Sequence, residues 1–171
     1  MPSDVKGILL SNRVVVPENY GTLVERGYGE KKEEGLTLSL YEACYLVEKG
    51  KLRVYKDGKE LSLEELLAHA EQAIENFYIK YAVFKDIRER GYVIKTGFKF
   101  GTHFRVYPRG KKPGEAHTRY VIHVWPEERN IELHEIARMV RLARAIRTEL
   151  ILALVDNENE IVYYKVERVG L

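Results

Sequence analysis

The sequence contains a single cysteine, Cys44, among 171 residues. One thiol excludes an internal disulfide framework and any zinc site built on several cysteines, so only histidines and carboxylates remain as potential metal ligands. Cys44 shares a predicted helix with Leu40 and Val47. We therefore expect it to be buried and unreactive.

Long apolar runs and common cofactor motifs are also missing. No segment approaches the roughly 18 consecutive apolar residues of a membrane span, and the first residues, MPSDVKGILL, lack a signal-peptide pattern. These absences predict a cytoplasmic protein with no membrane partner. The chain has no phosphate-binding glycine loop, no G-x-S-x-G and no H-E-x-x-H, so we predict no cofactor. His103, His117 and His123 could in principle bind a metal, but no carboxylate stands at ligand spacing, so we predict none.

Net charge is low, at +2, so affinity for nucleic acid would require an uneven distribution of charge. The 45% hydrophobic and 32% charged composition predicts a folded protein, and abundant Lys and Glu with little Cys or Met are typical of thermophiles. One segment is strongly basic. It holds seven cations and one acid, Glu115; the cations are Lys95, Lys99, Arg105, Arg109, Lys111, Lys112 and Arg119.

The hydrophobic pattern predicts a mixed α/β (α+β) fold with two domains, residues 1–80 and 81–171. The first domain is a small α/β unit with strands at 7–10, 13–16 and 52–55. Two capping boxes, Ser39 with Glu42 and Ser62 with Glu65, predict helix starts. Residues 64–90 are too long for one such helix and predict two helices joined near Asn76.

The second domain is predicted as a mixed sheet, with strands at 92–95, 98–107, 117–125, 150–155 and 161–168 and a helix at 132–148. Alternation turns Phe98, Phe100, Phe104 and Val106 inward, and Lys99, His103, Arg105 and Tyr107 outward. The same argument exposes His117, Arg119 and His123. Antiparallel pairing then brings Tyr107 and His117 together at the ends of a basic loop, residues 108–116. The alternative is that Tyr107 and His117 are ordinary polar surface residues with no catalytic role.

The helix at 132–148 is predicted to be amphipathic. Its buried stripe contains Leu133, Ile136, Val140, Ala143 and Ile146, whereas Arg141, Arg144 and Thr148 lie together on the exposed side. Exposed arginines bind phosphate through forked hydrogen bonds and stack on bases. An Arg-rich face that is merely solvated is the alternative.

Several of these segments together resemble the archaeal tRNA-splicing endonucleases (tRNA-intron lyases). The resemblance rests on the run 83–97, VFKDIRERGYVIKTG, on its continuation from Lys99 to Tyr107, on Ala116-His117-Thr118, on the arginine helix and on Val155-Asp156. It extends more loosely over the first half of the chain, including residues 38–43. A mixed two-domain fold, with a nuclease domain second, is what the resemblance implies.

The resemblance implies metal-independent cleavage of precursor tRNA at the bulge-helix-bulge of its intron boundaries, which leaves 2′,3′-cyclic phosphate and 5′-hydroxyl ends. Tyr107 matches the family's tyrosine, the general base for the 2′-hydroxyl, and His117 matches its histidine, the general acid. The family's lysine aligns with Thr148, which carries no charge. Either the chain is catalytically impaired or another cation substitutes, and Arg147 and Lys165 are the two candidates.

The resemblance also implies a homotetramer in which an acidic loop, here Asp156, Glu158 and Glu160, docks into a basic pocket of another subunit. An ordinary charged hairpin turn is the alternative. Arg141 corresponds to a family arginine that stacks on a bulge base, and Tyr163 is a second candidate for stacking. We expect RNA contacts from Arg105, Arg109, Lys111, Arg119, Arg141, Arg144 and Tyr163. Two rival functions remain, a non-catalytic subunit of a heterotetramer and a plain RNA-binding module.

Overall fold

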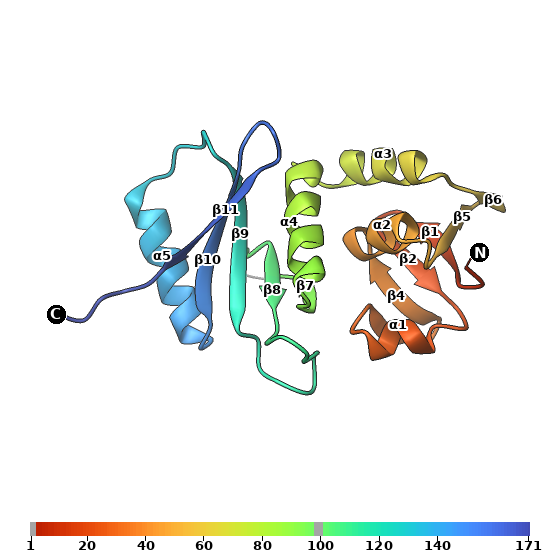
Figure 1. Ribbon diagram of the computed structural model, residues 1–171, viewed down its shortest axis with the longest axis horizontal. Coiled ribbons are helices and arrows are strands. Elements are labelled where there is room, and N and C mark those ends of the chain that lie inside the picture. Colours follow the sequence, from red (N-terminus) through yellow and green to blue (C-terminus); the bar gives the residue numbers. More distant parts are fainter. Residues whose placement is uncertain (1–2, 98–100) are drawn as a thin grey trace. The chain divides into compact units, whose positions relative to one another are not determined.

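Two compact units make up the fold of this computed structural model, which describes residues 3–97 and 101–171. Their boundary falls between Tyr78 and Ile79 (Figure 1). The architecture is mixed α/β in both units, as the sequence predicted. Among the described residues, no helix has the length and apolar character needed to cross a membrane.

The first unit is built on a six-stranded sheet in the order β3-β4-β2-β1-β5-β6. Strand β1 pairs with β2 in the antiparallel sense and with β5 in the parallel sense. Its strands are β1 (Lys6–Leu10), β2 (Arg13–Val16), β3 (Glu30–Lys32), β4 (Gly35–Ser39), β5 (Arg53–Lys56) and β6 (Lys59–Glu60). The sequence did not predict β3, β4, β6 or the short helix α1 (Gly21–Glu25).

Both predicted capping boxes are confirmed. Helix α2 (Leu40–Glu48) begins after Ser39, whose hydroxyl accepts from the Glu42 amide at 3.2 Å, while the Glu42 carboxylate accepts from the Ser39 amide at 3.0 Å. Helix α3 (Leu63–Ala73) begins in the same way with Ser62 and Glu65. Each box satisfies two amides that a helix start would otherwise leave unpaired.

Helix α2 is buried along most of its length, and Cys44 within it is fully buried. Burial, with a smaller effect of Glu48, raises the pKa of the Cys44 thiol to about 12. The expected buried thiol is therefore confirmed. The predicted helix break is confirmed too, because α4 (Phe77–Glu89) starts after Asn76, whose φ of 54° cannot continue a helix.

The second unit has a five-stranded sheet in the order β11-β10-β9-β8-β7. Strands β9 and β10 are parallel, and the other pairs are antiparallel. The strands are β7 (Ile94–Thr96), β8 (Phe104–Val106), β9 (Tyr120–Pro126), β10 (Glu149–Val155) and β11 (Ile161–Val166). Helix α5 (Leu133–Ala145) connects the two parallel strands, as a crossover between parallel neighbours requires.

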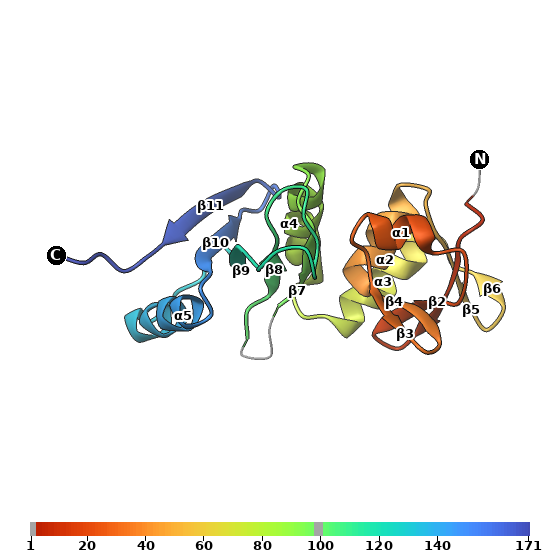
Figure 2. The same ribbon diagram turned by 90° about the horizontal axis from the view of Figure 1, so that it is seen from below.

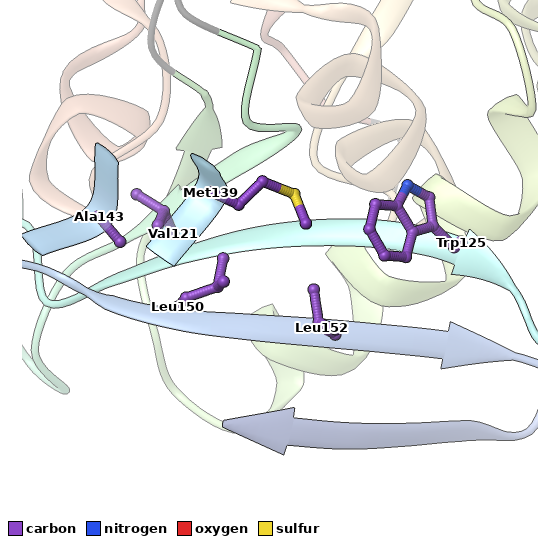
Figure 3. Packing of buried hydrophobic residues seen from close by; sticks show 6 residues of the cluster. All are labelled: Val121, Trp125, Met139, Ala143, Leu150 and Leu152. Carbon is purple, nitrogen blue, oxygen red and sulfur yellow. The ribbon is translucent and has the colours of Figure 1, made fainter. Parts of the chain in front are cut away.

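The two helices of this unit cover opposite faces of its sheet (Figure 1, Figure 2). On one face, the α4 ring of Phe84 lies 6.1 Å from the ring of Phe104, measured between centroids. On the other, Met139 and Ala143 of α5 pack on the sheet in a cluster shown in Figure 3; the sheet members are Val121, Trp125, Leu150 and Leu152. Strand β9 lies between these two layers, so all five residues from 121 to 125 are buried.

The predicted buried stripe of α5 is correct only in part. Ala143 is buried, and Ile136, Val140 and Ile146 are partly buried against the cluster. Leu133, however, is 84% exposed, because it opens the helix beyond the region that packs on the sheet. The helix also ends at Ala145, three residues before the predicted end.

Candidate active site

Tyr107 lies immediately after the last residue of β8, and its amide donates to the Val93 carbonyl at 3.0 Å. The prediction that its side chain is exposed is wrong, because the residue is only 7% exposed. The alternation of a strand does not extend to Tyr107: Val106 and Tyr107 are neighbours and both are buried. The phenol is therefore held by packing at one end of the sheet.

His117 is exposed, as predicted, but it precedes β9 and does not belong to it. Its Nε2 lies 2.9 Å from the Ile146 carbonyl oxygen, to which it donates. This bond fixes the imidazole against the C-terminal end of α5. In the neutral ring, Nδ1 is then the nitrogen without a proton, the one that can accept or release a second proton.

Residues 143–148 close α5 with a Schellman turn. The amide of Thr148 donates to the Ala143 carbonyl at 2.8 Å, and the amide of Arg147 donates to the Arg144 carbonyl at 3.0 Å. Arg147 takes the left-handed conformation of this turn, with φ of 58°. The position most often belongs to glycine, and here an arginine occupies it.

Thr148 was predicted to lie on the exposed face with Arg141 and Arg144, and this is wrong. Its side chain turns toward the helix end, where Oγ1 donates to the Ala143 carbonyl at 3.0 Å, and the residue is 9% exposed. The physical reason is that the helix has already ended, so the 100° step no longer applies. The position that the resemblance aligns with the family's lysine is thus used to close α5.

The fold nevertheless gathers the three candidate residues at one end of the second sheet. The amide of Arg119 donates to the Val106 carbonyl at 2.9 Å, which closes the connection that starts after β8. Tyr107 and His117 both lie within the segment that this bond closes, Tyr107 directly after Val106 and His117 two residues before Arg119. Thr148 immediately precedes β10, which runs parallel to β9 and starts at the same end of the sheet.

Neither substitute cation is shown to fill the place of the lysine. Lys165 makes ion pairs with Glu149 at 3.0 Å and Glu167 at 3.3 Å, and these bonds raise the pKa of its ammonium. Arg147 is exposed, with its backbone committed to the turn.

Most of the predicted RNA-binding cations are exposed, namely Arg109, Lys111, Arg119, Arg141 and Arg144, whereas Arg105 is half-buried. Lys99 lies outside the described residues, as do Phe98 and Phe100. The sequence did not single out Tyr92 and Tyr120, which pack against Arg109 and Arg119 respectively. Among 12 tyrosines, only the three-dimensional contacts distinguish these two.

Tyr163 is half-buried and donates from its hydroxyl to Asp86 at 2.6 Å. Burial and this bond to Asp86 raise the pKa of the Tyr163 phenol far above its ordinary value. The guanidinium of Arg90 lies 5.6 Å from the centre of its ring. An RNA base that stacked on the Tyr163 ring would therefore share the ring with the Arg90 guanidinium.

The acidic connection between β10 and β11 is a compact turn. The Asp156 carboxylate accepts from the amides of Glu158 at 2.8 Å and Glu160 at 2.9 Å. Asp156 therefore stabilises the turn itself. Glu158 and Glu160 remain exposed, and their carboxylates are available to a cationic partner.

His103 and His123 form a separate pair, with ring centroids 5.5 Å apart. Both were predicted to face solvent, but His123 is 8% exposed and His103 is half-buried, because this region of the sheet is covered. The Val124 amide donates to Nδ1 of His103 at 2.8 Å. In the described ranges, no group of three or more His, Cys, Asp or Glu side chains is arranged to hold a metal.

Comparison with known proteins gives the family. The sequence profile described as "tRNA intron endonuclease, catalytic C-terminal domain" matches residues 77–163, and the "tRNA intron endonuclease, N-terminal domain" profile matches residues 5–67. The chain is 45% identical to the tRNA-splicing endonuclease of Thermococcus onnurineus over 142 residues, 83% of this chain and 81% of that protein. It is 41% identical to that of Methanococcus maripaludis over 159 residues, 91% and 89% of the two chains. The protein therefore belongs to the tRNA intron endonuclease family.

Proposed function

We propose that the chain is a subunit of a tRNA-splicing endonuclease that cleaves precursor tRNA at the bulge-helix-bulge of its intron boundaries. The observation that carries this proposal is the gathering of Tyr107, His117 and the Thr148 segment at one sheet end. His117 is fixed there by its bond to the Ile146 carbonyl. Exposed Arg109, Lys111 and Arg119 supply positive charge along the same connection.

The proposed reaction is an attack by a 2′-hydroxyl on the adjacent phosphorus, which yields a 2′,3′-cyclic phosphate and a 5′-hydroxyl. The nucleophile is already tethered next to its target, so proton transfer and charge stabilisation suffice and no metal is required. Tyr107 in its phenolate form accepts the proton of the 2′-hydroxyl, and His117 in its imidazolium form donates a proton to the departing 5′-oxygen, as the bond from phosphorus to that oxygen breaks. The buried Tyr107 ring has little freedom to rotate, which favours a base held in position for the incoming RNA.

A second candidate is a non-catalytic subunit that assembles with an active chain. Thr148 favours it, because this side chain has no charge and its hydroxyl is bonded to the Ala143 carbonyl. A pentavalent phosphorane would then lack one stabilising cation. A plain RNA-binding module is the third candidate.

Cleavage of a bulge-helix-bulge RNA in EDTA separates these candidates. We expect slow cleavage by the chain alone, and His117→Ala is expected to lower that rate by about 100-fold or more, since general acid–base groups contribute factors of this size. His134→Ala on the exposed face of α5 is the matched control and should leave the rate unchanged. Cleavage only after an active relative is added identifies the non-catalytic subunit, and binding without cleavage in either case identifies the binding module.

We also propose that the chain forms a homotetramer. Support comes from the exposed carboxylates of Glu158 and Glu160 and from the edge strand β11, where Val162 is 51% and Tyr164 is 53% exposed. An edge strand with apolar side chains readily pairs with another copy. Sedimentation should give a tetramer for the unmodified chain and a smaller species for the Glu158→Lys, Glu160→Lys variant. A monomer in both cases would contradict this assembly.

A further inference from the structure

A hollow of ≈ 420 Å³ opens in the second unit on the face of the sheet that carries α4. The C-terminal end of α4 and residues of β8, β9, β10 and β11 line it, among them Val106, Tyr120, Glu149 and Tyr163. A volume of a few hundred Å³ is typical of sites for small ligands. The hollow is therefore large enough for one nucleotide.

Two tyrosines that line the hollow each pack against an arginine. The rings of Tyr92 and Tyr120 meet edge to face, with centroids 6.4 Å apart and an angle of 79°. The guanidinium of Arg109 lies 5.0 Å from the Tyr92 ring centre, and that of Arg119 lies 5.2 Å from the Tyr120 ring centre. Both tyrosines are half-buried, so each ring keeps some exposed surface. Interleaved aromatic rings and guanidinium groups are the means by which proteins hold single-stranded nucleic acid.

The charges around the hollow favour a phosphate at Arg109 and Arg119 over one at Lys165 or Arg90. Lys165 is neutralised by Glu149 and Glu167, and Arg90 pairs with Asp86 at 2.9 Å.

Arg109 differs from Lys165 and Arg90: within the part of the chain that the structure describes, no carboxylate lies at ion-pair distance from its guanidinium. Arg119 has one such neighbour, Glu149 at 3.9 Å, and is itself exposed. Arg109 and Arg119 therefore keep their charge for an anionic ligand.

The hollow adjoins the candidate active site through the backbone. Val106, in its lining, precedes Tyr107, and Glu149 follows Thr148. Tyr92 precedes Val93, whose carbonyl accepts from the Tyr107 amide. Thr148 is hydrogen-bonded to the end of α5, on one face of the sheet, and the hollow lies on the opposite face, which carries α4. An RNA strand that crosses this end of the sheet would therefore reach both Thr148 and the hollow.

We propose that this hollow binds an unpaired nucleotide of the RNA substrate adjacent to the cleaved phosphate. The base stacks on the ring of Tyr92 or Tyr120, and Arg109 and Arg119 bind the flanking phosphates. The inference rests on the proposed function, and it assigns to that function a base-stacking subsite on the chain's own sheet face.

The test measures the affinity of the full chain for a bulge-helix-bulge RNA and for a fully paired RNA of the same length. Tyr92→Leu and Tyr120→Leu are expected to weaken binding of the bulged RNA by about 10-fold to 100-fold, because stacking on one aromatic ring contributes on that scale. Binding of the paired RNA should stay unchanged. Tyr120→Phe retains the ring and should bind as the unmodified chain does. Tyr78→Leu, an exposed tyrosine at the N-terminal end of α4 that does not line the hollow, is the matched control.

A second measurement needs no variant. The fluorescence of 2-aminopurine placed at each unpaired position should be quenched at one position when the unmodified chain binds, because stacking quenches this base. Circular dichroism confirms that each variant is folded. If a leucine variant does not fold, this quenching alone decides the question.

The outcomes separate two failures. If the unmodified chain prefers bulged RNA, but the leucine variants keep that preference and no position is quenched, the subsite is wrong and the proposed function stands. If the unmodified chain binds bulged and paired RNA equally, the proposed function fails and the subsite fails with it. If the leucine variants change the sedimentation of the chain and not its affinity for RNA, the hollow is an interface between protein copies, which also overturns the proposal.

Discussion

Thr148→Lys is expected to raise the metal-free rate of RNA cleavage by about 100-fold to 1000-fold, the size of effect that one preorganised electrostatic group has in many active sites. The substitution places an ammonium where the structure has a hydroxyl bonded to the Ala143 carbonyl. The hydrogen bond from the Thr148 backbone amide to the Ala143 carbonyl does not involve the side chain, so it survives the substitution. Loss of the hydroxyl bond alone costs about 1 kcal/mol of stability, so the variant should fold. The measurement is the single-turnover rate on a bulge-helix-bulge RNA in EDTA.

Thr148→Gln is the matched control for this prediction, because glutamine is long and polar but uncharged. It should leave the rate at the level of the unmodified chain. Equal rates for the lysine and glutamine variants would show that charge at this position does not matter. An unchanged rate in a folded lysine variant would show that His117 and Tyr107 lack something other than the cation.

The second large effect is a loss of stability in acid. Burial lowers the pKa of both His103 and His123 to about 4, and nearby cations add to this: Lys80 and Arg129 at His103, Arg138 and Arg129 at His123. In the unfolded chain a histidine titrates near pH 6.5. Between these values the unfolded state binds protons that the folded state excludes, so the free energy of unfolding falls as pH decreases from about 6.5 to 4. From pH 7 to pH 5 we expect a loss of about 2 kcal/mol for each ring.

Denaturant titrations at pH 7 and pH 5 measure this loss. His103→Asn keeps an acceptor for the Val124 amide but cannot be protonated, so it should remove about half of the pH dependence. His134→Asn is the control, since His134 is exposed on α5 and should not alter the pH dependence. A pH dependence that is identical in the His103 variant and the unmodified chain would show that the buried pair is not its source.

The local signals in the sequence were reliable wherever structure depends on a few neighbouring residues. The capping boxes at Ser39 and Ser62 fixed two helix starts, and the break near Asn76 was found from segment length and composition. Residues 20–38 gave no such signal. Strand β3, Glu30–Lys32, is charged and exposed throughout, so it has no alternation to detect. Its place in the sheet depends on pairing with β4.

The errors at and near the candidate site have two causes: exposure depends on what covers a residue, and alternation or helical periodicity stops where the element ends. His123 was assigned to an open face, but β9 is covered on both sides and its alternation carries no information about exposure. Tyr107 and Thr148 were assigned by extending a strand and a helix beyond the residues where these elements end. The pairing of Tyr92 with Tyr120 joins positions 28 residues apart and has no local signature.

The chemical form of the cleaved RNA ends tests the central claim most directly. With Thr148→Lys in EDTA, the account predicts a 2′,3′-cyclic phosphate and a 5′-hydroxyl at each cut, and a loss of both products when His117→Ala is added. Ends that carry a 3′-hydroxyl and a 5′-phosphate, or products that form only when a divalent metal is supplied, would contradict it.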